Sequence, residues 1–526
     1  MSLLSQILII FLSMIYAQQN EYKEISEWDA EQTQLTTGSC TDCNLSPQAK
    51  WYFENEIIAP IPTAPSSAVT LPKWLEVLPT INDDIPLWIA SPDLIDQANL
   101  DDSGQSISIA DGQQIGFKTV PRIPQNQSFW NQDTSEFFKK RDIRLRGEII
   151  ADEFIARTVW PLDFAITNYQ LLPLSQDEDL QTLVQADDGG VQQPHQSRLL
   201  WEREPGAALE STGKAVFGLM LNGAQGDDDE ALAGHFAGVT GKFNADGSYH
   251  DWLVTNFYNL DTVSEKAIIA AVTPMDNYLA DLNAGQNYYR PSYMLFATLK
   301  DGQPTAEFQQ SINQVMNHFY RHNFIYNHAD ANCTGITIDT LRALGWKVPT
   351  RGINGYVMAI GAYFYTAITE ADLDAARQIY DYLTTETTRL LPAVAFDAIG
   401  EDLLRLTATE PPRSLTDYEQ RLTESIEAIW FVRIPQIPSS RALGGAPIYS
   451  FSEYLETAPA DRDDWVTIEL ADRDIPPALK VDKPVNPKPH PLPWTIVVIL
   501  LGLTGLFIVL LRWLLKAFFS RNKTLR

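Results

Sequence analysis

The most constraining feature of this chain is a turn flanked by two segments of alternating polarity. Residues 244–247 read Asn-Ala-Asp-Gly, which suits a type I turn with glycine in the left-handed position. The turn separates residues 234–243 from residues 248–258. If Phe243 pairs with Ser248, one face becomes largely apolar and the other largely polar, as a half-buried hairpin requires. The pattern therefore predicts an antiparallel hairpin.

This register places a histidine beside an amide. His235 falls opposite Asn256 on the apolar face, so the amide oxygen should accept a hydrogen bond from the ring and hold it in one tautomer. A histidine held in this way can act as a general base, and the alternative is a capped histidine at the edge of the core. A slip of one residue would exchange the two faces and would make Asp251 the partner in place of Asn256.

The same register assigns the other hairpin residues to faces. With His235, the apolar face carries Ala237, Val239, Trp252 and Val254, and the polar face carries Thr240, Lys242, Asp251 and Thr255. His250 shares the face of His235 but lies several residues along the strand, too far for direct contact.

A second signal follows Asn332. Apolar residues recur at helical spacing from Ile336 to Leu344, and Gly345 suits a left-handed helix stop. Asn332 is a favourable N-cap, so Cys333 should stand in the first helical turn. The unpaired N–H groups and the dipole of a helix start favour a thiolate there and could receive an oxyanion. The alternative is a buried structural cysteine.

A hairpin that carries His, followed by a helix that starts with Cys, resembles the circularly permuted papain-like enzymes of the NlpC/P60 type. Within that group, Asn-Cys-Thr at residues 332–334 is most similar to the Lnb-type periplasmic domain. The resemblance spans roughly residues 213–350. It implies a thiol hydrolase or acyltransferase that acts on amide or ester bonds, with Cys333 as nucleophile and His235 as base. The hairpin register adds Asn256 as the third site residue.

Two other interpretations stay open. Asn327 precedes the cysteine by six residues, where papain-type enzymes carry a side-chain oxyanion donor, although those enzymes use Gln. His318 and His322 share a helix face, and with His328 and Asp330 their spacing could hold zinc. The glutamate of an H-E-x-x-H metalloprotease is missing, so surface or core histidines are the simpler account. We therefore expect no metal and no cofactor.

The two ends of the chain bear on its compartment. Residues 1–17 form an apolar run of signal-peptide length without the usual basic start, either cleaved or retained. Residues 494–511 are an uninterrupted apolar span long enough for a tilted membrane helix, and basic residues follow to position 526. Because such basic flanks stay in the cytoplasm, we expect a single-pass membrane protein whose N-terminal domains are exported.

Charge and cysteine content narrow the function classes. The chain has 67 acidic and 39 basic residues, which argues against nucleic acid as a partner. Of its three cysteines, Cys40 and Cys43 could pair with each other in an oxidising compartment, which leaves Cys333 as the odd thiol. A free thiol in an exported protein is a candidate for chemistry.

The expected fold class is α+β, with a permuted papain-like core between two other modules. Within it we expect a strand at residues 215–221, a helix at 305–320 and helices over 367–430, with Thr369 and Asp372 as a capping box. In chain order we expect a signal peptide (1–17), a loose polar segment (18–49), a β-rich module (50–205), the catalytic core (206–350), a helical module (351–470), a Pro-rich stalk (471–493), a transmembrane helix (494–511) and a basic cytoplasmic tail (512–526).

The expected function is acyl transfer by a Cys-His pair on a peptide, lipid or lipoprotein of the cell envelope. The alternative is an inactive papain-like scaffold that acts as a membrane-anchored binding protein. The distance between the cysteine sulfur and the histidine ring distinguishes the two, because a catalytic pair must come within hydrogen-bond reach.

Overall fold

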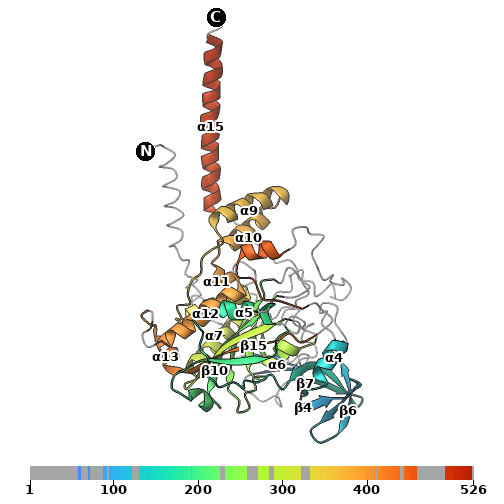
Figure 1. Ribbon diagram of the computed structural model, residues 1–526. Helices are drawn as coiled ribbons and strands as arrows, with labels where there is room; N and C mark the ends of the chain where they lie inside the picture. The colour runs from blue at the N-terminus through green and yellow to red at the C-terminus, as the bar shows by residue number, and fades with distance from the viewer. Residues whose placement is uncertain are drawn as a thin grey trace, which may run out of the picture.

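The protein is a mixed α+β molecule, as the sequence predicts (Figure 1). A computed structural model describes residues 57–60, 69–70, 87–91, 94–120, 130–186, 188–190, 192–224, 232–257, 271–282, 290–320, 332–408, 411, 413–438, 443–458 and 492–523. Several predictions fall outside these residues: the signal run, Cys40 and Cys43, Asn327, three of the proposed zinc ligands (His322, His328 and Asp330) and nearly all of the stalk.

A ten-stranded sheet forms the centre of the molecule, in the order β2-β1-β3-β13-β12-β11-β10-β14-β15-β9. Its strand pairs are antiparallel except for the parallel pair of β13 and β3. The strands are β1 (Ile57–Pro60), β2 (Val69–Thr70), β3 (Leu87–Ala90), β9 (Gln196–Glu202), β10 (Ala215–Asn222), β11 (His235–Lys242), β12 (Leu253–Asn256), β13 (Ala271–Pro274), β14 (Ser292–Leu299) and β15 (Ile426–Ile434).

A closed five-stranded barrel lies beside this sheet, drawn in blue in Figure 1. It comprises β4 (Leu94–Leu100), β5 (Ser106–Ile109), β6 (Gln114–Thr119), β7 (Asp142–Ile150) and β8 (Glu153–Pro161). The N-terminal region is thus rich in strands, as predicted. The central sheet nevertheless crosses the expected boundary after residue 205, because β9 pairs with β15.

The helices fall into three groups. Those near the sheet and barrel are α4 (Gln132–Phe138), α5 (Leu180–Gln185), α6 (Met275–Ala280), α7 (Gln303–Tyr320), α8 (Cys333–Ala343), α11 (Thr387–Leu390), α12 (Pro392–Leu406) and α13 (Asp417–Ser425). A hairpin of α9 (Tyr356–Thr369) and α10 (Leu373–Thr384) lies apart from them, with the short α14 (Phe451–Thr457) nearby (Figure 1). The C-terminal helix α15 (Trp494–Lys523) rises away from the body in the same view.

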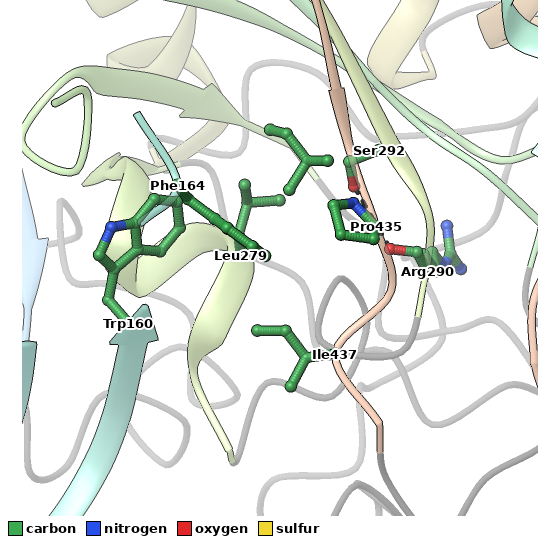
Figure 2. Close-up of a pocket in the computed structure, with 8 residues that line it drawn as sticks. Trp160, Phe164, Leu279, Arg290, Ser292, Pro435 and Ile437 are labelled. Carbon is green, nitrogen blue, oxygen red and sulfur yellow. Dashed lines mark hydrogen bonds between the residues drawn. The ribbon is translucent and has the colours of Figure 1, made fainter. Parts of the chain in front are cut away.

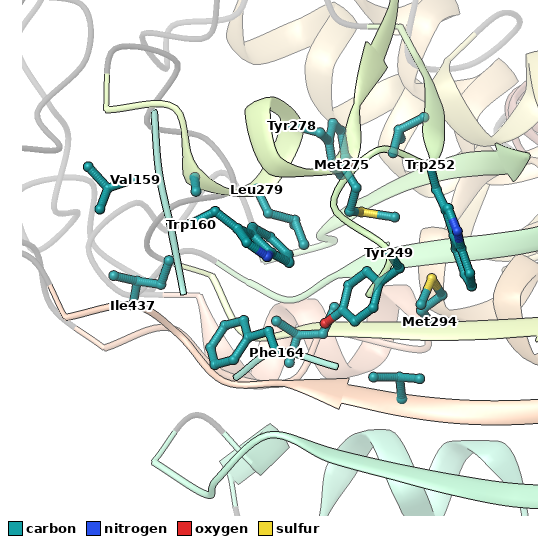
Figure 3. Packing of buried hydrophobic residues seen from close by; sticks show 14 of the residues in the cluster. Val159, Trp160, Phe164, Tyr249, Trp252, Met275, Tyr278, Leu279, Met294 and Ile437 are labelled. Atoms are coloured by element: carbon teal, nitrogen blue, oxygen red, sulfur yellow. The ribbon is translucent and has the colours of Figure 1, made fainter. Parts of the chain in front are cut away.

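Both faces of the central sheet are buried. The helix-side core includes Phe217, Leu219, Leu221, Phe236, Phe308, Ile312, Cys333, Ile336, Trp346 and Phe396. The barrel-side core, part of which Figure 3 shows, includes Val159, Trp160, Phe164, Val216, Met220, Ala237, Val239, Tyr249, Trp252, Val254, Met275, Tyr278, Leu279, Met294 and Ile437. Odd and even positions of β10 and β11 therefore serve different cores, as side-chain alternation requires.

The predicted hairpin is present, but its register differs by two residues. β11 and β12 pair Gly238 with Thr255, so Phe243 does not pair with Ser248. The Phe243 N–H donates to the Lys214 carbonyl at 2.9 Å instead, because the chain between the strands forms a long loop. A shift of two residues leaves every side chain on its predicted face.

Two helical predictions are wrong in part. The stretch 367–430 is helical only up to Ser425, because Ile426–Ile434 is rich in β-branched and aromatic residues and forms β15. Thr369 and Asp372 do not form a capping box: Thr369 ends α9, and Asp372 itself caps α10. The predicted strand at 215–221 and the helix at 305–320 are confirmed as β10 and α7.

By length and apolarity taken together, no helix in the described part of the chain qualifies as a membrane span. The predicted helix at residues 494–511 is present as the first part of α15.

Buried ion pairs join α6 to the barrel. Asp276 at the start of α6 is fully buried and lies 2.8 Å from Nε of Arg146 and 3.7 Å from Nε of Arg144, both on β7. Arg157 of β8 lies 3.5 Å from Asp281. Pairs of this kind are strongly destabilised when only one partner is removed.

We predict that Asp276→Ala lowers the free energy of unfolding by about 3–5 kcal/mol, because the buried guanidinium of Arg146 loses this carboxylate, whereas Arg144 keeps Asp96 at 2.7 Å. Urea unfolding followed by tryptophan fluorescence measures the change. Lys118→Ala is the matched control: the Lys118–Glu153 pair is 60% and 40% exposed, so its loss should cost less than about 1 kcal/mol. Equal losses in the two variants would contradict a role for the buried pair.

A half-buried histidine packs against the barrel-side core. The ring of His195 stacks on Phe164 at 5.0 Å, and its Nε2 contacts the Tyr249 hydroxyl at 2.9 Å. Burial lowers the pKa of His195 from 6.5 to about 4. Between these two pH values the unfolded chain therefore binds a proton that the folded chain does not.

Stability should consequently fall as the pH drops from 6.5 to 4, because the folded-state pKa of His195 is the lower one. We expect His195→Gln to remove about 2–3 kcal/mol of that acid sensitivity. The measurement is the difference in unfolding free energy between parent and variant at pH 7 and near pH 4.5. A difference that stays constant with pH would show that His195 does not titrate as described.

Candidate active site

The first half of the site is built where β11 begins. Gly234 has φ +78°, and a Cβ atom there would lie 2.4 Å from the Asn222 carbonyl oxygen. Only glycine tolerates both the left-handed backbone and this close approach. Gly234 thereby lets His235 enter the sheet directly opposite Asn222 of β10.

His235 and Asn256 form the hydrogen bond that the sequence predicts. His235 Nε2 and Asn256 Oδ1 are 2.9 Å apart, and His235 is only 3% exposed. The contact is diagonal across the ladder, because the strand register is shifted. An amide oxygen can only accept, so Nε2 carries the proton in this pair and Nδ1 is the basic nitrogen.

A row of buried polar side chains continues from His235 across the sheet. Asn222 pairs with His235 on one side and with Ser292 of β14 on the other. Its Nδ2 donates to the Ser292 hydroxyl at 2.9 Å, and its Oδ1 accepts from the Tyr278 hydroxyl. The Tyr278 ring lies 6.3 Å from the His235 ring. Sequence reasoning missed these three partners, although Asn222 and Ser292 are the polar ends of two otherwise apolar strands.

A small cavity of about 10 Å³ lies at the end of this polar row (Figure 2). Its wall is mostly apolar, and Arg290 and Ser292 are its polar members. The lining residues are Trp160, Phe164, Leu279, Arg290, Ser292, Ile434, Pro435 and Ile437. A cavity of this size holds no more than about one water molecule.

The second half of the site is the start of α8, as predicted. Asn332 is the N-cap, and its Oδ1 accepts from the Gly335 N–H at 2.7 Å. Cys333 stands in the first turn, forms no disulfide with the described residues and is 5% exposed. Its Sγ lies 3.8 Å from the Thr334 hydroxyl.

The helical segment around α11 fixes this helix start. Asn332 Nδ2 donates to the Leu390 carbonyl at 3.1 Å. Arg389 binds Asp339 of α8 through two hydrogen bonds of 3.0 and 2.8 Å. Burial raises the pKa of Asp339, so its ionised form depends on Arg389. The position of Cys333 therefore depends on residues more than fifty positions further along the chain.

α8 contacts β11, but the two halves of the site belong to different faces of the sheet. Alternation assigns the His235 ring to the side of Ala237 and Val239, which pack in the barrel-side core. Phe236 points the other way and shares the helix-side core with Cys333. Because His235 is the first residue of β11, its ring can meet the thiol only around the end of the strand. The Cys333–His235 contact stays a prediction.

The alternative partners of His235 lie elsewhere. Asp251 is exposed and accepts a hydrogen bond from Asn244 Nδ2 at 2.8 Å, so the slip of one residue does not occur. His250 is partly buried, and burial together with the nearby Arg144 lowers its pKa. The described residues contain no group of His, Cys, Asp or Glu side chains that could hold a metal.

Comparisons with protein families, with curated proteins and with solved structures find no match to this chain.

We predict that Asn332→Ala lowers the free energy of unfolding by about 1–3 kcal/mol, because it leaves the Gly335 N–H and the Leu390 carbonyl without their partners. Asn332→Asp keeps the cap acceptor and loses only the donor to Leu390, so its loss should be smaller. Thermal unfolding by circular dichroism compares the two variants. Unchanged midpoints in both would show that Asn332 does not hold the start of α8.

Proposed function

We propose that this protein is a cysteine-dependent acyl-transfer enzyme, an amidase, peptidase or acyltransferase. The observation that carries the proposal is the His235–Asn256 hydrogen bond of 2.9 Å at one strand end, with the Cys333 thiol at the start of an N-capped helix that packs against the same strand. A buried amide that orients an imidazole, and a thiol at a helix N-terminus, are the parts that thiol catalysis requires.

In this mechanism the Cys333 thiol gives its proton to Nδ1 of His235, and Sγ attacks the acyl carbonyl carbon. The N–H groups at the start of α8 stabilise the oxyanion. The bond to the leaving group breaks as the imidazolium returns the proton to it, which leaves an acyl-thioester. Water or an acceptor alcohol or amine then attacks the thioester, gives its proton to the imidazole and releases the thiol.

The proposed substrates are peptides, lipids or lipoproteins of the cell envelope. Support comes from the apolar first part of α15, where Leu501, Leu506 and Val509 are 65%, 57% and 63% exposed. Side chains of this kind suit a lipid environment better than water. We propose that α15 attaches the enzyme to a membrane and that the basic tail beyond it remains in the cytoplasm.

We predict a graded loss of turnover. Cys333→Ala should abolish acylation, and Asn256→Ala should lower kcat by a smaller factor, because an orienting residue assists the base without doing the chemistry. Asp251→Ala is the matched control on the same hairpin and should leave kcat unchanged. Burst-phase acylation with an activated ester substrate measures all three variants.

The nucleophile itself is tested with a thiol-directed probe at mildly acidic pH. Cys333 in the folded protein should react faster than a model thiol, and Asn256→Ala should slow the reaction. Labelling no faster than the model thiol would refute an activated nucleophile. Loss of activity in Asp251→Ala but not in Asn256→Ala would refute the assignment of Asn256.

A second candidate is a binding protein without catalysis. The observation that favours it is that strand alternation assigns His235 to the barrel side of the sheet, whereas Cys333 lies in the helix-side core. In that case Cys333→Ala would leave ligand binding unchanged.

A further inference from the structure

Helix α9 presents an apolar face to its surroundings. Val357, Tyr365 and Ile368 are 86%, 70% and 78% exposed. They recur with Gly361 at helical spacing, so they form one continuous stripe along α9. No residue from Gly352 to Thr369 carries a charge. We call this stripe the outer face of α9.

The outer face of α9 is not the face that packs against the neighbouring helix α10. Ala376, Tyr380 and Leu383 of α10 are buried. They pack with Ala359 and Tyr363 of α9, so the hairpin already has its own core. The exposed side of α10 carries the polar residues Asp374 and Gln378, and Leu373 is its one exposed large apolar residue. The exposed side of α9 is therefore the more apolar of the two.

The hairpin of α9 and α10 packs against the first turn of α15. Ile496 is fully buried in the same core as Tyr363 and Tyr380, and the Tyr380 hydroxyl contacts Thr495. Further along α15, the exposed apolar side chains include Leu501, Leu506 and Val509. Figure 1 shows α9 lying across the base of α15 where the long helix leaves the body.

Two exposed apolar surfaces lie close to this shared core. Leu501 is five positions beyond Ile496, a rise of about 8 Å along the helix axis. α9 packs in the same core as Ile496, so its outer face lies within about one helix diameter of that part of α15. Trp494 is 67% exposed at the same base. Exposed Trp and Tyr side chains are typical of a membrane interface.

We propose that the outer face of α9 lies in the headgroup region of a lipid bilayer, parallel to the membrane surface, as a second contact beside α15. The inference rests on the membrane attachment proposed above. The lipid it contacts is zwitterionic, because Glu370 and Asp372 in the turn after α9 and Asp374 in the first turn of α10 would repel an anionic surface.

The test uses the full-length chain in phosphatidylcholine nanodiscs with a photoreactive phenylalanine analogue at one site at a time. The analogue replaces Tyr365 on α9, Gln378 on the polar side of α10 as matched control, or Leu506 on α15. After irradiation, mass spectrometry identifies what each site has captured. We expect lipid adducts at 365 and 506 and none at 378.

The outcomes separate the two proposals. A lipid adduct at 506 without one at 365 would overturn the interfacial position of α9 and leave the attachment by α15 intact. No lipid adduct at either site would overturn both. Capture of a second copy of this chain at 365 would show that the outer face of α9 is a protein interface instead.

Discussion

Side-chain alternation along β11 governs what chemistry the central sheet can host. The sheet is buried on both faces, so each residue of the strand belongs to one core or to the other. Alternation assigns the His235 side chain to the barrel side of the sheet, and Phe236 packs in the helix-side core that contains Cys333. Only the first position of the strand lets an imidazole serve a helix on the opposite face, because a ring there can turn around the strand end. The motif Gly234-His235 occupies that position.

The start of α8 depends on a later part of the chain. Asn332 caps the helix and also binds the carbonyl of Leu390, and Arg389 binds Asp339 on the same helix. A single short segment around α11 therefore sets both the axial position and the rotation of α8. Because α11 runs directly into α12, which packs against the central sheet, the thiol and the sheet share one rigid support.

The sequence was sufficient for local features of the site and insufficient for its long-range partners. The cap at Asn332, the turn at Gly247 with φ +72° and the His235–Asn256 hydrogen bond follow from signals within about twenty residues. The register was wrong because Trp252 donates its indole N–H to the Lys242 carbonyl, a contact that closes a long loop instead of a tight turn. The predicted faces are nevertheless correct, because the direction of side chains repeats every two residues along a strand and the register error was also two residues.

Other features could not be predicted, for a different reason. In the sequence, β15 lies between helices, but in the sheet it lies between β14 and β9. A local sequence pattern does not identify a strand partner that is more than a hundred residues away. The polar row of Asn222, Tyr278 and Ser292 joins three separate elements in the same way. In each case the sequence shows the residue type, but the strands and side chains that it contacts depend on the sheet topology.

Buried ion pairs limit access to His235 from the side of α6. α6 carries Tyr278 and Leu279, which cover the barrel side of the polar row, and Asp276 binds α6 to Arg146 of the barrel. Displacing α6 would separate a buried ion pair, at a cost of several kcal/mol. Approach to the His235 imidazole from the side of α6 is therefore costly, and the end of β11 at Gly234 is the direction in which its ring could turn toward the face that holds Cys333.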